Sequence, residues 1–203
     1  MPKITTISLQ KNNKNRCNLF IDGEFYKGIS LESVYKNRLK EGQEISLDKL
    51  DYILMENERN DALSKALNYI SKTLKTKRQV FDYLTKKGYS EEISYQVIDK
   101  LKEYKYLDDE NYSKRYIESI NSQGPKLVQY KLMGKGVKKQ DIDKAFEDAE
   151  VDYNAMALAV LEKYLRSKEI TKENLAKAYR YLLGRGFSYE QVDFALSRFK
   201  ENV

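Results

Sequence analysis

Apolar and polar positions follow two different periods along this chain, and the change falls near residue 30. Before it, apolar positions form short runs such as Leu19–Ile21, and the separating residues include Asn12–Asn15 and Asp22–Gly23. Short apolar runs bounded by turn residues predict β-strands. Asp22 and Gly23 both tolerate positive φ, so they predict a two-residue hairpin turn. The first 29 residues therefore predict a small antiparallel sheet.

From residue 30 onwards, apolar residues recur at intervals of three and four, which is typical of amphipathic α-helices. Ser30 is expected to cap a short helix that continues to Leu39 and ends at Lys40–Gly42. Ser46 is expected to cap a second helix, which can run past Asn57 without a break. Helix should then dominate the rest of the chain.

A repeat organises the helical part of the chain. Its anchors are three glycines, Gly88, Gly136 and Gly186, which lie 48 and 50 residues apart. Each glycine follows a leucine by four residues and a cation by one; these residues are Leu84, Leu132 and Leu182, and Lys87, Lys135 and Arg185. A fixed period of this length predicts tandem copies of one supersecondary unit. We expect three helices in each copy, the second of them ended by a left-handed glycine.

Cap signals mark other helix ends inside the repeats. Thr76–Gln79 and Ser188–Gln191 have the form of capping boxes, and Asp108 can cap the helix that follows it. Gly124–Pro125 should break the chain before a new helix, because a proline at the first helical position loses no hydrogen bond.

These patterns predict a mainly α protein of three tandem three-helix repeats, with a small antiparallel β element at its N-terminus. The expected divisions are residues 1–59 for the β element and first helices, 60–107 for repeat 1, 108–150 for repeat 2 and 151–203 for repeat 3. A tetratricopeptide array is disfavoured because its period is about 34 residues. A chain of 203 residues with 41% hydrophobic residues and a mean hydropathy of −0.73 suits several small cores.

Composition bounds the partners and the compartment. The formal net charge of +6 and the pI near 9.0 favour an acidic partner, such as nucleic acid or an acidic protein surface. The single cysteine, Cys17, cannot form an internal disulfide, and the first nine residues lack the apolar core of a secretion signal. No run approaches the roughly 20 apolar residues of a membrane span. We therefore expect a cytoplasmic protein that does not associate with membranes.

Residues suited to catalysis or metal binding are scarce. The absence of histidine excludes imidazole metal sites and histidine-based catalysis. Gly134–Gly136 and Gly184–Gly186 lack Walker A spacing, and each follows a predicted helix where a phosphate loop would follow a strand. Capping explains Asp108–Glu110 without a metal, and packing in a strand explains Cys17. We expect no catalytic site, no metal and no cofactor.

Charge is distributed unevenly between the helices. Residues 121–140 carry five lysines and no carboxylate, and residues 72–87 carry six cations against Asp82 alone. Residues 141–150 carry five carboxylates. Stacked repeats would therefore show separate basic and acidic surfaces, able to meet phosphates and basic protein patches.

Several short motifs, taken in order and spacing, resemble the RecX family, which regulates the RecA recombinase in DNA repair, recombination and the SOS response. The motifs are Lys87–Ser90, Tyr106–Asp109 with Tyr112, Gly124–Pro125 with Leu127 and Leu132, and Lys135–Val137. The resemblance covers residues 60 to 200, and the first strands resemble those of RecX proteins from Gram-positive bacteria. It implies an elongated, curved array of repeats that lodges in the groove of the RecA–DNA filament and blocks its extension or promotes its disassembly. Lys138 replaces the small capping residue usual in the family, so that cap should be weaker.

Charge and resemblance together predict the site that grips the filament or DNA. Its expected members are Lys77, Arg78, Lys87, Lys126, Lys131, Lys135, Lys138, Lys139, Arg180 and Arg185. The expected partners are the RecA filament and, through weak direct contacts, single- and double-stranded DNA, with the protein acting as a monomer. Two alternatives stay open: a helical nucleic-acid-binding protein that acts without RecA, and a general helical scaffold. If the cations do not grip the filament, the acidic helix with Asp141, Asp143 and Glu147 is the next candidate.

Overall fold

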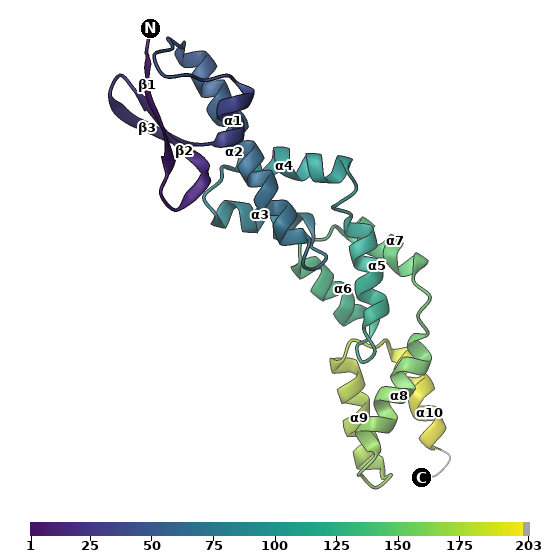
Figure 1. Cartoon of the computed structure of the whole chain (residues 1–203). Coiled ribbons are helices and arrows are strands. Elements are labelled where there is room, and N and C mark those ends of the chain that lie inside the picture. Colours follow the sequence, from purple (N-terminus) through teal and green to yellow (C-terminus); the bar gives the residue numbers. More distant parts are fainter. Residues whose placement is uncertain (201–203) are drawn as a thin grey trace. The chain divides into compact units, whose positions relative to one another are not determined.

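The computed structural model describes residues 1–200, and within them it contains ten helices and a three-stranded sheet (Figure 1). The chain forms two compact units. Unit 1 comprises residues 1–71 and 84–99, and unit 2 comprises residues 72–83 and those from 100 onwards. The predicted fold class, mainly helical with a small antiparallel sheet at the N-terminus, is confirmed.

The sheet of unit 1 has the order β1-β2-β3, and both strand pairs are antiparallel. Its strands are β1 (Ile4–Gln10), β2 (Asn13–Ile21) and β3 (Glu24–Ser30). The turn between β2 and β3 has positive φ at Asp22 (50°) and Gly23 (89°), as the hairpin prediction requires. The predicted antiparallel sheet and its turn are therefore confirmed.

Two serine caps open the first helices, α1 (Leu31–Lys36) and α2 (Leu47–Ile70). The hydroxyl groups of Ser30 and Ser46 accept hydrogen bonds from the third residue that follows each of them. The expectation that the first helix continues to Leu39 is wrong. α1 ends at Lys36 because the chain turns at Arg38, whose φ is +50°. The second helix does run past Asn57 without a break.

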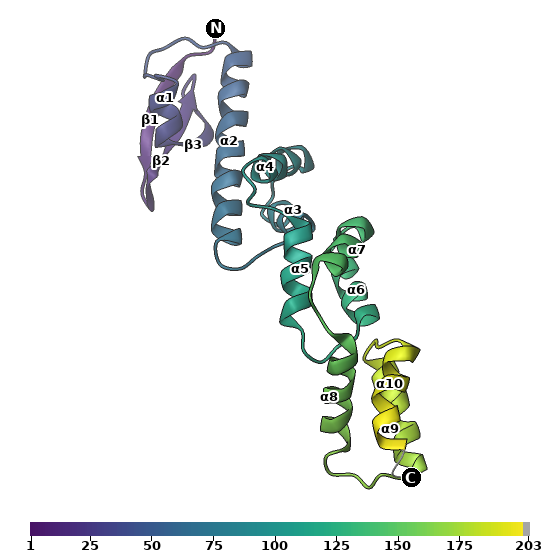
Figure 2. The same ribbon diagram turned by 90° about the vertical axis from the view of Figure 1, so that its right-hand side faces the viewer.

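The core of unit 1 lies between the sheet and α2, which run side by side in Figure 2. Its fully or nearly fully buried residues on the sheet and on α2 include Ile4, Cys17, Leu19, Ile29, Leu50 and Ile53. Alternation along β2 places Cys17, Leu19 and Ile21 on the covered face. Cys17 is thus a packing residue, and burial raises the pKa of its thiol.

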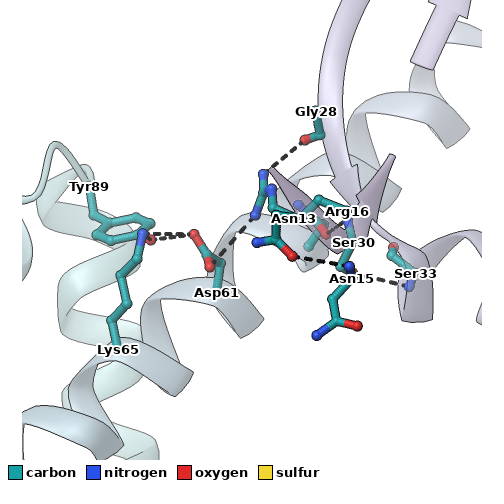
Figure 3. A network of polar contacts seen from close by, with 10 residues as sticks. Asn13, Asn15, Arg16, Gly28, Ser30, Ser33, Asp61, Lys65 and Tyr89 are labelled. Atoms are coloured by element: carbon teal, nitrogen blue, oxygen red, sulfur yellow. Dashed lines mark hydrogen bonds and ion pairs between the residues drawn. The ribbon is translucent and has the colours of Figure 1, made fainter. Parts of the chain in front are cut away.

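A polar network centred on Asp61 of α2 ties the sheet to this helix (Figure 3). Asp61 accepts hydrogen bonds from Tyr89 Oη at 2.5 Å and Lys65 Nζ at 3.0 Å. Arg16 Nη1 of β2 lies 3.7 Å from the other carboxylate oxygen, and Arg16 also donates to the carbonyl of Gly28 at 3.3 Å. Burial raises the pKa of Asp61, but these donors outweigh it and hold the pKa below its ordinary value.

Within the described residues, eight further helices follow, and together with α2 they form three successive sets of three. The eight helices are α3 (Lys77–Lys86), α4 (Glu91–Glu103), α5 (Asp109–Ser119), α6 (Pro125–Gly134), α7 (Lys139–Asp148), α8 (Tyr153–Leu165), α9 (Lys172–Gly184) and α10 (Tyr189–Lys200). Helices α5, α6 and α7 enclose a core that includes Ile117, Leu132 and Ile142. Helices α8, α9 and α10, side by side in both views, enclose a larger core around Leu161 and Leu182. α3, α6 and α9 are the second helices of the three repeats.

The predicted caps are confirmed. Both capping boxes are reciprocal: the backbone N–H of Thr76 donates to Gln79 Oε1 at 3.0 Å and that of Ser188 to Gln191 Oε1 at 2.9 Å. Asp108 accepts two backbone N–H groups of α5. Lys138 begins α7 without a side-chain hydrogen bond, so this cap is the weaker one, as expected.

Candidate nucleic-acid interface

The start of α6 rests on the end of α9. The backbone N–H of Gly124 donates to the carbonyl of Arg185 at 2.9 Å, and that of Lys126 donates to the carbonyl of Gly186 at 3.1 Å. A Cβ atom on Gly124 would overlap the backbone of Gly186 and Phe187. Because the N-terminal end of a helix is positive and the C-terminal end is negative, this end-to-end junction is electrostatically favourable. We call it the α9–α6 joint.

The start of α3 rests on the end of α6 in a related way. Thr76 Oγ1 donates to the carbonyl of Lys135 at 2.8 Å. A Cβ atom on Gly136 would overlap the side chain of Arg78. At this α6–α3 joint, as at the α9–α6 joint, the cation–glycine pair that ends one second helix receives the start of another.

A buried carboxylate completes the α6–α3 joint. Asp109, 3% exposed at the start of α5, accepts the backbone N–H of Lys77 at 2.9 Å. Burial raises the pKa of Asp109, although the Lys77 amide and the nearby Lys77 charge act against that shift. The sequence reading explained Asp109 only as a favourable charge on its own helix. The sequence did not predict that Asp109 accepts a hydrogen bond from the start of α3, 32 residues away. Capping patterns relate a side chain only to the helix that it begins.

Three predicted site cations gather at the α6–α3 joint. Lys77 Nζ lies 3.9 Å from Asp109 Oδ2, and Arg78 Nε donates to Asp82 Oδ1 at 2.8 Å. Lys135 Nζ lies 5.7 Å from the centre of the Tyr116 ring, within the range of a cation–π contact. Two of the three cations therefore face a carboxylate, and their charge is partly offset.

Two more predicted cations lie at the α9–α6 joint. Lys126 Nζ lies 5.4 Å from the centre of the Tyr189 ring, and the guanidinium of Arg185 lies 5.0 Å from the centre of the Tyr181 ring. Lys131 lies further along α6, half-buried, and it forms no ion pair with any residue in positions 1–200. Residues 121–140 contain no carboxylate, so no acidic residue of this segment offsets the charge of the α6 cations.

The other predicted site residues lie elsewhere. Lys87 is exposed and belongs to unit 1. Lys138 is exposed at the start of α7, and Lys139 forms an ion pair of 2.6 Å with Asp143. Arg180 lines a groove of about 460 Å³ between α9 and α10. Within unit 2, the structure therefore brings together the cations of the two joints and of α6.

The described part of the chain offers little for other kinds of site. Across residues 1–200, no group of three or more cysteines, aspartates or glutamates is arranged to hold a metal ion. None of the helices in that range has the length and apolar character needed to span a membrane.

Three family models match separate parts of the chain. They are the RecX N-terminal domain over residues 2–46, the first RecX three-helix domain over 62–101 and the third over 150–196. A regulatory protein RecX of Clostridium tetani is 36% identical over 202 residues, covering 97% of this chain and 94% of the relative. The chain belongs to the RecX family. A RecX of Clostridium perfringens strain SM101 is 34% identical over 208 residues, 100% of this chain and 98% of its own.

Two solved RecX structures share the fold. A crystal structure of regulatory protein RecX superposes with a TM-score of 0.74 at 23% identity, covering 97% of this chain and 100% of that one. RecX from Lactobacillus salivarius gives 0.66 at 24% identity, covering 72% of this chain and 99% of that one. These two structures support the fold, and the family models with the curated relatives confirm the predicted family.

Proposed function

We propose that this RecX-family protein binds the RecA–DNA filament and inhibits or modulates the recombinase and ATPase activities of RecA during DNA repair and recombination. We further propose that it acts without catalysis of its own, in the cytoplasm and as a monomer. Contacts with single- and double-stranded DNA would add to its contacts with RecA protein.

The observation that carries this proposal is the position of the α6 cations. Lys126, Lys131 and Lys135 follow one helix between the two joints, in a segment of 20 residues, 121–140, that has no carboxylate. Lysines that keep their charge release counterions when they meet phosphates, and they attract acidic protein surfaces over several ångströms. Their neighbours at the joints, Lys77, Arg78 and Arg185, would extend the contact.

Lys139 contributes less to the proposed grip than its sequence suggests. Its ammonium group already faces Asp143 at 2.6 Å, on the acidic helix α7. Binding a phosphate there would require this ion pair to open. We therefore place the main contact on α6 rather than on α7.

Charge reversal of α6 tests the proposal. The triple variant Lys126→Glu, Lys131→Glu, Lys135→Glu should remain folded and should inhibit RecA strand exchange and ATPase activity much less than the wild type. The slope of log affinity against log salt should flatten by roughly two to three units if each lysine meets one phosphate.

A matched control separates local charge from net charge. Lys11, Lys14 and Lys40 are exposed on unit 1, and reversing them also lowers the formal net charge from +6 to 0. This control variant should inhibit RecA as the wild type does. If the α6 variant is folded by circular dichroism and still inhibits at wild-type concentrations, the proposed grip is wrong, and reversal of Asp141, Asp143 and Glu147 becomes the next test.

The two alternative functions give other outcomes with the wild-type protein. Tight binding to naked DNA with no effect on RecA would favour a nucleic-acid-binding protein that acts independently. No response of either RecA or DNA would favour a helical scaffold.

A further inference from the structure

The exposed face of α6 carries aromatic side chains beside its lysines. Tyr130 is 74% exposed and lies one helical turn after Lys126, so the two side chains are neighbours on one face. Tyr189, 61% exposed in the first turn of α10, has its ring 5.4 Å from Lys126 Nζ. Lys126 is therefore adjacent to two tyrosines that both show a ring to solvent.

Neither of these two rings stacks on another ring within residues 1–200. Tyr130 makes no ring contact and no hydrogen bond in that range, and the ring of Tyr189 has Lys126 Nζ 5.4 Å from its centre. By contrast, Tyr164 and Tyr181 stack on each other with ring centres 4.4 Å apart and help to close the core of α8–α10. The rings of Tyr130 and Tyr189 are thus open to a partner.

The charge of this face favours an anionic partner. Residues 121–140 supply only lysines, and the backbone N–H groups of Gly124 and Lys126 already donate to α9. A phosphate would therefore be met by the lysine side chains. Two carboxylates lie on α10. Glu190 accepts a hydrogen bond from the Ser188 hydroxyl at 3.3 Å, and Asp193 lines the groove between α9 and α10 together with Arg180.

We propose that Tyr130 and Tyr189, with Lys126 adjacent to both, form a stacking site for the bases of single-stranded nucleic acid. Proteins that bind single strands without reading their sequence combine cations for the phosphates with exposed rings on which unpaired bases stack. A duplex keeps its bases stacked on one another, so it would gain only the lysine contact. This inference deepens the proposed function, on which it rests for taking DNA as a partner, and it adds a preference for unpaired strands.

The substitutions Tyr130→Leu and Tyr189→Leu test the site, with affinity measured by fluorescence anisotropy on a labelled oligothymidylate and on a duplex. Each leucine should weaken single-strand binding about 5- to 100-fold and leave duplex binding nearly unchanged. Tyr130→Phe and Tyr189→Phe keep the ring and should bind as the wild type does. Tyr52→Leu is the matched control, because Tyr52 is 60% exposed on α2, and it should have no effect.

Several outcomes would overturn the inference. One is wild-type affinity of the leucine variants for the single strand, with folding verified by circular dichroism. Another is equal loss of single-strand and duplex binding, because stacking cannot explain it. A third is a selective loss of RecA inhibition with intact strand binding, which would assign the face to a protein contact.

The proposed function is tested separately by RecA inhibition with the wild-type protein. If the wild type binds the single strand through its tyrosines but leaves RecA unaffected, the stacking site stands and the proposed function fails. If the wild type inhibits RecA but does not bind the naked strand, the stacking site fails and the proposed function stands.

Discussion

Alanine substitutions at four glycines can separate the two reasons for which a glycine is needed here. Gly88 has φ +90° but open space around its missing Cβ, whereas Gly124 has an ordinary φ of −74° and no room. Gly186 combines φ +87° with overlap of its Cβ and Leu127. Gly184, the last residue of α9, has neither constraint. The four sites therefore cover every combination of positive φ and steric overlap at the missing Cβ.

The structure gives each substitution a different expected cost. At Gly88 the left-handed backbone costs alanine about 1–2 kcal/mol, partly offset by about 0.4–1 kcal/mol from a stiffer unfolded chain. At Gly124 the new methyl group must separate α6 from α9, which costs about 1–3 kcal/mol for overpacking and about 1 kcal/mol for each weakened hydrogen bond. Gly186→Ala bears both costs and should be the most destabilising. Gly184→Ala should be neutral or stabilising by up to about 1 kcal/mol.

Urea unfolding followed by far-ultraviolet circular dichroism measures these differences, provided that the m-value stays constant across the series. The free energy of unfolding should decrease in the order Gly184→Ala, wild type, Gly88→Ala, Gly124→Ala and Gly186→Ala. If Gly124→Ala costs no more than Gly88→Ala, the close packing at the α9–α6 joint is refuted. Neutral alanine substitutions at all of Gly88, Gly136 and Gly186 would refute the repeat assignment itself.

Two further predictions concern buried or paired carboxylates, and urea unfolding across pH tests both. The pKa of Asp109 is raised above 3.8 in the folded protein, so the folded state favours the protonated carboxyl group over the ionised one. The free energy of unfolding of the wild type, relative to that of Asp109→Asn, should therefore increase as pH falls from the raised pKa towards 3.8. Asp109→Ala should lose about 1 kcal/mol because Lys77 loses its acceptor, whereas the asparagine retains one. The pKa of Asp61 is lowered, so the advantage of the wild type over Asp61→Asn should be full above pH 3.8 and shrink as pH falls through the lowered pKa. A pH-independent difference would contradict either assignment.

Local signals in the sequence were sufficient for most of the fold. Positive φ at Asp22 and Gly23, the two capping boxes and the left-handed Gly136 depend on residues within a few positions of one another. Such features are set by backbone sterics and short-range hydrogen bonds, which a single sequence shows directly. Arg38 is an exception, because a non-glycine residue with φ +50° follows the early end of α1 without any sequence signal.

The candidate site was less predictable because its members meet across long sequence separations. The charge pattern identified the lysines of α6, but it could not show that Lys126 lies beside Tyr189 or that Lys135 lies beside Tyr116. The ion pairs of Arg78 with Asp82 and of Lys139 with Asp143 are different, because their spacing of four residues in a helix predicts them. The 74% exposure of Tyr130 could not be predicted either, because tyrosine is intermediate between buried and exposed residue types. Which rings lie beside the cations, and which rings stay exposed, depends on packing between helices.

The joints explain why a cation precedes each repeat glycine that receives another helix. At Lys135 and Arg185 the chain must turn out of a helix while presenting a carbonyl to the next helix start, and the glycine that follows allows that close approach. The side chain before the glycine then projects beside the joint, where a cation is favoured by the negative helix end. A structural rule for joining helices thus places positive charge repeatedly along the second helices. The phosphate contacts that we propose would use these same positions, so they would need no additional structural element.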